Sequence, residues 1–386
     1  MMDFEIPENL RIMVETIRRF RIQDLEPISQ QVEDDDEMPE YIVQKMRELG
    51  LFGIALPEEY GGLELGALGE ALVQEELSKA NACFRSRIAG TNGIGSQGIV
   101  MYGTKEQKEK YLPRLASGEW TGCLGLTEPD AGSDAQNIRT RAELKGDHWV
   151  LNGTKQFITN GDVADMSTVI AVTEPSKRGR GGMTAFIVEK TFPGYSVGSI
   201  DQPMGLRGNH TAQLVFEDCE VPRENVIGGE EMIGQGFKMA MQIMDKARLI
   251  ISSHALGAAQ RILELSIEHS KIRHTFGKPI GQHQLVTAML AEMATEIYAA
   301  RQMLYHACWL RDKYGKKVVK EASMVKLFCT EMANRVAYKG VQIHGGYGWM
   351  KEYAVERFYR DLRLLTLFEG TSEIQKLIIG RELLRD

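Results

Sequence analysis

The segment Tyr359-Arg-Asp-Leu-Arg-Leu-Leu-Thr-Leu-Phe-Glu-Gly-Thr-Ser-Glu-Ile-Gln375 places one carboxylate, Glu369, between an apolar run and the start of a helix. Gly370 gives the backbone freedom after it, and Thr371 is suited to cap a helix with Glu373 in its first turn. We expect this helix to bury an apolar stripe, made of Ile374, Leu377, Ile378 and Leu384. Burial raises the pKa of a carboxylate and a helix N-terminus lowers it. Glu369 is therefore a candidate general base, although a surface acid that caps a helix has the same local pattern.

Length, charge and cysteine pattern exclude several classes of protein. A chain of 386 residues is longer than a single hydrophobic core usually supports, so two or three domains are expected. The net charge of -7 and the lack of a strongly basic stretch argue against a nucleic-acid binder. The sequence shows neither a signal-peptide pattern nor an apolar run of membrane-spanning length. The five cysteines are scattered without metal-like spacing, so we predict no metal site and a reducing, cytoplasmic location.

Hydrophobic periodicity divides the chain into three zones. Residues 1–120 have helical spacing, residues 121–230 contain short runs with strand-like alternation, and residues 231–386 have long helical periods. The middle zone predicts a small antiparallel barrel or sandwich. Short loops in the last zone predict antiparallel neighbours in a four-helix bundle. The predicted fold class is α+β, mostly α, with one domain for each zone.

Two segments of the middle zone have ligand-binding chemistry. The loop 124–134 combines hydroxyls with glycines that expose backbone N–H groups, which suits an anion or a polar heterocycle, although an interdomain loop has the same composition. In the segment 152–161, alternation places Phe157 and Thr159 on one face of a strand. That pair suits a flat conjugated ligand or a plain core. The glycines of 90–95 have the wrong spacing for a dinucleotide fingerprint, so a nicotinamide cofactor in the usual fold is not predicted.

Together these segments resemble the acyl-CoA dehydrogenase family over essentially the whole chain. The motifs that carry the resemblance are Leu126–Asp134, Phe157–Asn160, Met204–Gly208, Asp245–Arg248, Arg273–Pro279, Gln342–Gly348 and Phe368–Gln375. The resemblance implies an N-terminal helical domain, a middle β-barrel and a C-terminal four-helix bundle, with FAD between the last two.

The resemblance also implies which residues contact FAD. The flavin and its phosphates would meet Leu124, Leu126, Thr127 and Ser133. Phe157 would flank the isoalloxazine, and Thr159 would hydrogen-bond near its N5 atom. Positions that reach the FAD of a neighbouring subunit are Arg273, Thr275, Phe276, His283, Gln284, Gln342, Gly345 and Gly346, while Thr371 and Glu373 match contacts to the adenosine half. A cofactor shared between chains implies an obligate oligomer, and a homotetramer is the usual family form.

The mechanism implied by the resemblance centres on Glu369. It would remove the pro-R α-proton of an acyl-CoA thioester while the β-hydrogen leaves as hydride to flavin N5, giving a trans-2-enoyl-CoA. The Glu369 backbone N–H and the ribityl 2′-hydroxyl of FAD would hold the thioester oxygen as negative charge develops. Some relatives carry the base beside the Asp-x-x-Arg motif, but Lys246 and Ala247 are not carboxylates here. Electrons would then pass to an electron-transfer flavoprotein.

The substrate positions implied by the resemblance are Ser133, Asp245, Arg248, Phe368, Gly370, Arg85 and Ser86. Asp245 and Arg248 are three residues apart on one helix face, so they also suit a local ion pair. The stretch Phe84-Arg-Ser-Arg87 is similar to the Tyr-Arg-Ser of members that act on glutaryl-CoA, in which the arginine and serine hold the distal carboxylate. A dicarboxylic acyl-CoA is therefore one candidate substrate.

The leading hypothesis is an FAD-dependent acyl-CoA dehydrogenase. Phe157, Leu124 and Phe368 replace a tryptophan, an aromatic residue and a tyrosine that are frequent in the family, which leaves the acyl-pocket shape open. A flavin oxidase or monooxygenase on the same fold is a second hypothesis, and a non-enzymatic assembly protein is a third. Acyl chain length, branching and physiological direction do not follow from the sequence.

Overall fold

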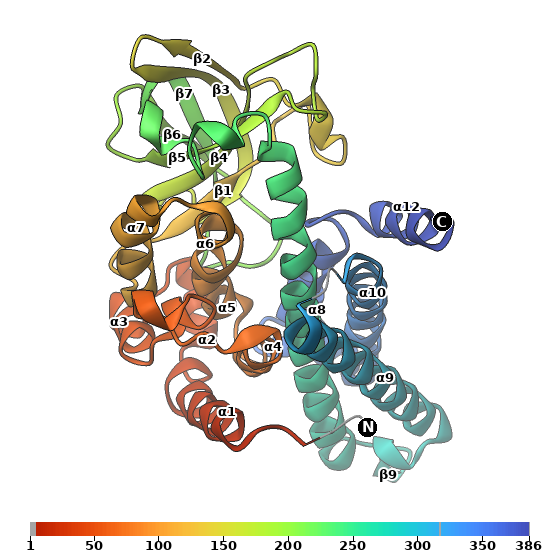
Figure 1. Cartoon of the computed structure of the whole chain (residues 1–386). Helices are drawn as coiled ribbons and strands as arrows, with labels where there is room; N and C mark the ends of the chain where they lie inside the picture. The colour runs from red at the N-terminus through yellow and green to blue at the C-terminus, as the bar shows by residue number, and fades with distance from the viewer. Residues whose placement is uncertain (1–4, 316–317, 386) are drawn as a thin grey trace.

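The N-terminal part of the chain is helical, in a computed structural model that describes residues 5–315 and 318–385 (Figure 1). Asn81 caps one of its helices by accepting a hydrogen bond from the Cys83 N–H, and a Thr104–Gln107 capping box begins another. The helical elements are α1 (Glu8–Phe20), η1 (Arg21–Leu25), α2 (Ser29–Asp35), α3 (Glu40–Glu48), α4 (Gly66–Leu77), α5 (Ala82–Ala89), η4 (Gly90–Gly95), α6 (Gln97–Tyr102) and α7 (Lys105–Ser117).

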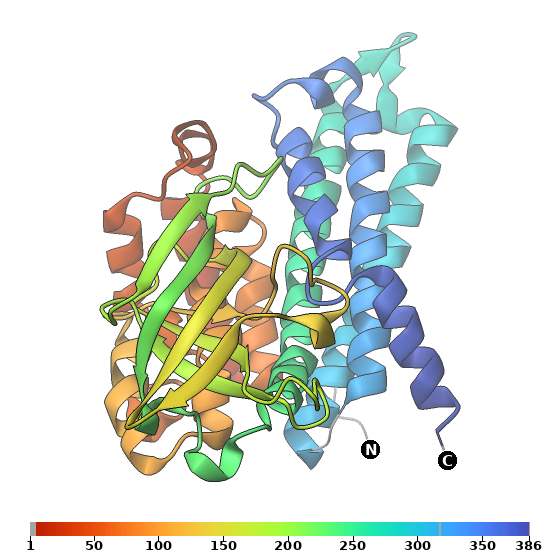
Figure 2. The same cartoon turned by 90° about the horizontal axis from the view of Figure 1, so that it is seen from above.

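The middle part forms a curled seven-stranded sheet (Figure 2). Its strands are β1 (Gly122–Gly125), β2 (Arg141–Lys145), β3 (His148–Thr159), β4 (Met166–Val172), β5 (Met183–Glu189), β6 (Tyr195–Ile200) and β7 (Thr211–Pro222). The order is β1-β4-β2-β3-β7-β6, and β5 pairs with the other edge of β4. The prediction of an antiparallel barrel or sandwich was wrong for β1, which runs parallel to β4. Two strands intervene between them in the chain, and such a long connection allows parallel pairing.

The glycine-rich element η4 joins the first helices to the sheet. A Cβ atom at Gly95 would lie 2.6 Å from the carbonyl carbon of Gly122, so the backbones of η4 and β1 are in direct contact. The Thr168 hydroxyl on β4 donates to the Gly95 carbonyl at 2.7 Å. This contact fixes the N-terminal helices against the start of the sheet.

The C-terminal part is a helical bundle built around α8 (Gly236–Ile272), which runs from the sheet to the far end of the bundle (Figure 1). Two long helices, α9 (Gln284–Tyr314) and α10 (Val319–His344), and the shorter α11 (Ala354–Arg363) complete it. The short strands β8 (His274–Thr275) and β9 (Lys278–Pro279) form a hairpin between α8 and α9. Buried side chains such as Leu304 and Met332 fill the bundle core. The predicted three-part fold is confirmed.

The last helix, α12 (Ser372–Leu383), begins as predicted but packs differently. The Thr371 hydroxyl accepts a hydrogen bond from the Ile374 N–H. The predicted buried stripe was wrong: Leu377 is 70% exposed and Leu384 is 87% exposed, while Ile374 and Ile378 are only partly buried. Figures 1 and 2 show the reason, because α12 leaves the body of the chain after its first turn. Among the described helices, none is long and apolar enough to cross a membrane.

Candidate active site

Glu369 lies in the short loop between α11 and α12. Its backbone φ is 54° and that of Gly370 is 88°, so two consecutive residues are in the left-handed region. This conformation costs about 1–3 kcal/mol for a residue with a side chain, so its surroundings must hold it. Gln375, the first buried residue of α12 beyond Ser372, donates from Nε2 to the carbonyls of Glu369 at 3.2 Å and Gly370 at 2.9 Å. Lys326 of α10 donates to the Gly370 carbonyl at 2.8 Å.

Glu369 is half-buried, and one of its carboxyl oxygens is fully buried without a hydrogen-bond partner in the described chain. Its Oε2 atom has no hydrogen bond within residues 5–315 and 318–385. Burial raises the pKa of Glu369 to about 7, and the positive charges of Arg85, Arg248 and Lys326 oppose this rise. A carboxyl group with a pKa near neutrality accepts and releases a proton at physiological pH, which a general base requires.

The three cations come from different helices. Arg248 of α8 donates to the Asp245 carboxylate at 2.6 Å, so the predicted ion pair is present and buried. Burial lowers the pKa of Arg85, on α5, to about 10, while the charges of Glu369 and Glu70 oppose this. Arg85 thus remains protonated at neutral pH. Its neighbour Ser86 is also buried.

Arg85 belongs to a buried polar cluster with Gln74 of α4 and His254 of α8. Arg85 is 4% exposed, and its one hydrogen bond to a described residue joins Nε to the Gln74 Oε1 atom at 3.1 Å. The Nε2 atom of Gln74 and both ring nitrogens of His254 are buried without partners in the described chain. Burial and the nearby Arg85 charge hold the pKa of His254 well below its usual range. Sequence reasoning missed Gln74 and His254, although each interrupts an apolar helix face.

The predicted flavin-contact residues gather at one end of the sheet. Leu124 is buried in β1, Leu126 and Thr127 are half-buried, and Ser133 is exposed in the following loop. The hydroxyls of Thr127, Ser133 and Thr159 make no hydrogen bond to another described residue, so they remain available to a ligand.

Phe157 presents an uncovered ring beside Thr159 at the end of β3. It is 64% exposed with a φ of 58°, and the β3–β7 register shifts between Lys155 and Ile158. Gln156 and Ile158 are buried whereas Phe157 and Thr159 are not, so the two predicted residues do share a face. An open aromatic ring next to unpartnered hydroxyls fits a flat conjugated cofactor such as FAD.

An ion pair that the sequence analysis missed supports this loop. Glu128 accepts hydrogen bonds from Lys155 Nζ at 2.7 Å, from the Thr140 N–H at 2.9 Å and from the Arg139 N–H at 2.5 Å. Lys155 is fully buried and also donates to the Leu126 carbonyl at 3.2 Å. The carboxylate therefore ties the loop to β3.

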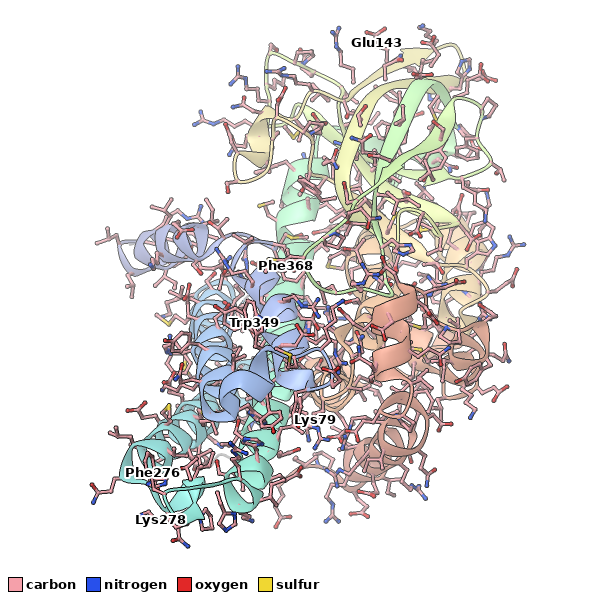
Figure 3. All side chains as sticks on the ribbon, turned by 180° about the vertical axis from the view of Figure 1, so that it is seen from behind. Lys79, Glu143, Phe276, Lys278, Trp349 and Phe368 are labelled. Carbon is pink, nitrogen blue, oxygen red and sulfur yellow. The ribbon has the colours of Figure 1, made fainter. Side chains whose placement is uncertain are left out.

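A second group of predicted residues lies far from Glu369. Figure 3 shows Phe276 and Lys278 at the far end of the bundle, whereas Phe368 lies nearer the end at which α8 meets the sheet. Phe276 is 95% exposed. The rest of this group lies on the same hairpin and helix ends, at Arg273, Thr275, His283, Gln284, Gln342, Gly345 and Gly346. The stacking of His269 on His344, with ring centroids 4.3 Å apart, joins these helix ends.

One chain thus brings together only part of the predicted cofactor set. This second group is here called the distal set, and its member Phe276 lies well away from Phe368, the residue before Glu369 (Figure 3). Phe368 packs against the bundle core beside Glu369, while Thr371 is half-buried and Glu373 is exposed at the start of α12.

Comparison with known proteins covers nearly the whole chain. The family models described as the N-terminal, middle and C-terminal domains of acyl-CoA dehydrogenase match residues 7–119, 123–219 and 234–384. A relative named acryloyl-CoA reductase (NADH), from Anaerotignum propionicum, is 43% identical over 387 residues, which span 100% of this chain and 96% of that protein.

Two solved structures with different acyl groups in their names are almost equally similar. Butyryl-CoA dehydrogenase from Megasphaera elsdenii has a TM-score of 0.95 at 36% identity, and the match covers 100% of both chains. A glutaryl-coenzyme A dehydrogenase in complex with glutaryl-CoA has a TM-score of 0.94 at 34% identity, covering 99% of this chain and 97% of that one. Overall similarity therefore does not choose the acyl group.

A third structure bears on the cofactor. An acyl-CoA dehydrogenase complexed with FAD, from Bacillus anthracis, has a TM-score of 0.92 at 36% identity, covering 100% of this chain and 68% of that one. The uncovered Phe157 ring and the open hydroxyls fit the same cofactor, and FAD is the cofactor of this protein. The chain belongs to the acyl-CoA dehydrogenase family and is an oxidoreductase of that family.

Proposed function

We propose that this protein interconverts an acyl-CoA and its trans-2-enoyl-CoA, with Glu369 moving the α-proton. The observation that carries the proposal is the Glu369 carboxyl, which has a buried, unpartnered Oε2 atom and a pKa raised to about 7. A base with this pKa is ionised in a useful fraction at neutral pH and is basic enough to take a proton. Bound FAD supplies the hydride acceptor for the β-hydrogen.

The loop also offers a hydrogen-bond donor for the substrate. The Glu369 backbone N–H donates to no residue in the described part of the chain. The left-handed backbone at Glu369 and Gly370 is held through its carbonyls, because Gln375 donates to the Glu369 carbonyl and Lys326 donates to the Gly370 carbonyl. A donor held in place stabilises negative charge on the thioester oxygen as the α-proton leaves. Arg85 and Arg248 add positive charge near the same point.

An anaerobic flavin-bleaching screen tests this function. Oxidised enzyme is mixed with straight, branched, cyclic and dicarboxylic acyl-CoAs, and loss of flavin absorbance is followed. We expect rapid bleaching with one class of thioester and none with free acids. Because one relative is named a reductase, the dithionite-reduced enzyme is also mixed with the enoyl-CoA products. Failure to bleach or reoxidise with any thioester would contradict the proposal.

Oxygen reactivity separates the dehydrogenase from an oxidase or monooxygenase. We propose that an electron-transfer flavoprotein accepts the electrons, as is usual in this family. Aerobic turnover should then release little hydrogen peroxide. Stoichiometric peroxide, or an oxygenated product, would favour the oxygen-using alternatives.

We further propose a substrate with an anionic tail, such as a dicarboxylic acyl-CoA. The supporting observation is Arg85, a buried cation with only one hydrogen bond to a described residue. The nearby Glu70 pairs with Lys246 at 2.9 Å, so the Arg85 charge is not fully matched. A buried charge without hydrogen-bond partners is costly, and a ligand carboxylate would supply the missing acceptors. In the screen, glutaryl-CoA should bleach the flavin faster than hexanoyl-CoA.

We propose a homotetramer in which the distal set completes the cofactor site of a neighbouring subunit. The 95% exposure of Phe276 and the outward position of α12 support this arrangement, because both leave apolar surface uncovered in one chain. FAD should then stabilise the oligomer by linkage. Sedimentation of holo-protein and deflavinated protein tests this, and a stable FAD-containing monomer would contradict it.

We also propose the domain boundaries and the cellular location of this protein. Domain boundaries near residues 120 and 230 are supported by the end of α7 at Ser117 and by the start of α8 at Gly236. A cytoplasmic location is supported by the five cysteines, all of which are free and buried. Limited proteolysis and fractionation of the producing cells test them.

A further inference from the structure

Lys326 is a fully buried lysine beside the catalytic loop. It lies on α10 at 0% exposure, and its ammonium makes one hydrogen bond to a described residue, to the Gly370 carbonyl at 2.8 Å. Within residues 5–315 and 318–385 it has no ion pair closer than 4.0 Å. A buried ammonium is unfavourable, and burial lowers the pKa of Lys326 to about 8. An unpaired buried cation at this position needs an explanation beyond helix packing.

The hydrogen bond from Lys326 ends on the loop that carries Glu369. The Gly370 carbonyl accepts from Lys326 Nζ at 2.8 Å and from Gln375 Nε2 at 2.9 Å. Two donors on one carbonyl fix the orientation of the peptide group between Gly370 and Thr371, one residue after Glu369. Gln375 also donates to the Glu369 carbonyl at 3.2 Å, so the left-handed backbone at Glu369 and Gly370, with φ values of 54° and 88°, is held at two successive carbonyls. Lys326 therefore connects α10 to this loop through one hydrogen bond.

The charge of Lys326 acts on the same loop. The cations that face Glu369 are Arg85 of α5, Arg248 of α8 and Lys326 of α10. Arg248 is paired with Asp245 at 2.6 Å. The Arg85 charge also interacts with the Glu70 carboxylate. Lys326 alone of these cations also bonds to the loop that carries Glu369.

Other charged groups surround Lys326 at longer range. The carboxylates of Glu331 on α10 and Glu373 on α12 favour its charged form, and Arg248 on α8 disfavours it. Glu331 already accepts a hydrogen bond from the Ser372 hydroxyl at 2.5 Å. These groups leave Lys326 positively charged next to Glu369 without drawing its ammonium away from the Gly370 carbonyl.

We infer that Lys326 is a positioning residue for proton transfer, which holds the Glu369–Gly370 loop through the Gly370 carbonyl and favours the ionised form of Glu369. This inference rests on the proposed role of Glu369 as the base. In the proton-transfer step Lys326 keeps its own proton, and only the substrate α-proton moves, to the Glu369 carboxylate. The step therefore needs no further reactant.

The test uses holoenzyme with Lys326→Met, Lys326→Arg and a control, Lys320→Met. Methionine has a similar length and no charge, and arginine keeps the charge. Lys320 is a half-exposed lysine on the same helix, with a side chain that is 42% exposed. FAD content, unfolding temperature and the pH dependence of kcat/KM are measured for each. Hydrogen exchange of the peptide that spans residues 364–376 reports the loop independently of activity.

The expected result has two parts. Removing a cation raises the pKa of Glu369, so the rise of kcat/KM with pH should move up by about one unit in Lys326→Met. Loss of the anchor should lower the maximum of kcat/KM by roughly 10- to 100-fold and speed exchange of the loop. Lys326→Arg should restore the pH midpoint, and Lys320→Met should match the wild type.

Several outcomes overturn the inference. An unchanged midpoint and unchanged loop exchange in Lys326→Met would show that the lysine neither holds the loop nor acts on Glu369. Equal loss of FAD and stability in both Lys326 variants would assign it a purely structural role. The Glu369→Gln enzyme, measured in parallel, separates the role of Glu369 from the role of Lys326. If Glu369→Gln remains active, the proposed base is wrong. If Glu369→Gln is inactive but the pH midpoint of Lys326→Met is unshifted, only the role of Lys326 is contradicted.

Discussion

Two loops of this molecule each hold a glutamate with a buried carboxyl oxygen, and the two carboxyl groups behave in opposite ways. Glu128, in the loop after β1, is exposed by only 6% and accepts hydrogen bonds from Lys155 and from two backbone N–H groups. Burial works against its ionised form, but the Lys155 charge and the hydrogen bonds hold the pKa of Glu128 below its usual value. Glu369 has nearby charges but an unpartnered Oε2 atom, and burial raises its pKa to about 7.

The difference lies in partners rather than in residue type. A carboxylate whose oxygens are satisfied is stable as an anion and serves as a structural tie. A carboxylate left without donors inside the protein stays ready to take a proton. In this protein the first arrangement shapes the loop that is predicted to contact FAD, and we propose that the second performs the chemistry.

The largest expected effect is on catalysis by Glu369→Gln. The amide is nearly isosteric, so the loop and the FAD content should survive, while proton abstraction loses its base. Flavin bleaching should slow by about 100- to 10,000-fold. The control is Glu352→Gln, at an exposed position before α11, which should behave as wild type. Near-normal bleaching by Glu369→Gln would place the base elsewhere.

The matching change at the other loop should affect stability instead. Glu128→Gln leaves the Lys155 ammonium buried without its counter-ion, and breaking a buried pair in this way costs about 3–5 kcal/mol. Urea unfolding of the holo-protein should show this loss together with weaker FAD retention. In the Glu128→Gln, Lys155→Met double variant, part of the stability should return. A Glu128→Gln protein as stable as wild type would contradict the structural role.

The two glutamates also predict opposite responses of stability to pH. The folded pKa of Glu128 is lowered, so its stabilisation is present above the unfolded value and is lost as pH falls through the folded one. The folded pKa of Glu369 is raised to about 7, so folding favours its protonated form and stability falls as pH rises from the unfolded value, about 4.5, to about 7.

Glu369→Gln should therefore stabilise the protein at pH 8, by up to about 3 kcal/mol, and change stability little at pH 4. Thermal unfolding of the two proteins at both pH values measures this. Equal stability at pH 8 would indicate that the folded pKa of Glu369 is not raised.

A smaller effect is expected from Arg85→Ala. If the polar cluster binds an anionic tail, charge-assisted hydrogen bonds contribute about 1.5–3 kcal/mol, or roughly ten- to a hundred-fold in preference. kcat/KM should then fall selectively for glutaryl-CoA and change little for hexanoyl-CoA, which has a tail of similar length. Equal losses on both substrates, or a wild type that prefers hexanoyl-CoA, would exclude the dicarboxylic proposal.

The sequence predicted local features better than distant contacts. Thr371 caps α12 and Asp245 pairs with Arg248 because each feature depends on residues within one helical turn. Gln74 and His254 were missed because their meeting with Arg85 depends on how three separate helices pack.

Two other features also depended on tertiary structure. The direction of β1 relative to β4 is set by the path of the intervening strands, and no local pattern encodes it. The exposed leucines of α12 follow from a helix that leaves the body of one chain, so a correct helical period gave a wrong burial pattern. Lys326 resembles any helical lysine in sequence, and only its contact with the Gly370 carbonyl distinguishes it.

The proposed chemistry depends on the raised pKa of Glu369, and infrared titration measures this pKa without relying on enzyme activity. Difference spectra of wild type minus Glu369→Gln, recorded from pH 5 to pH 9, isolate the carbonyl band of one protonated carboxyl group. We expect a band that is strong at pH 5 and disappears with a midpoint near pH 7, in line with the pKa of about 7. A carboxyl group that is already fully ionised at pH 5 would contradict it.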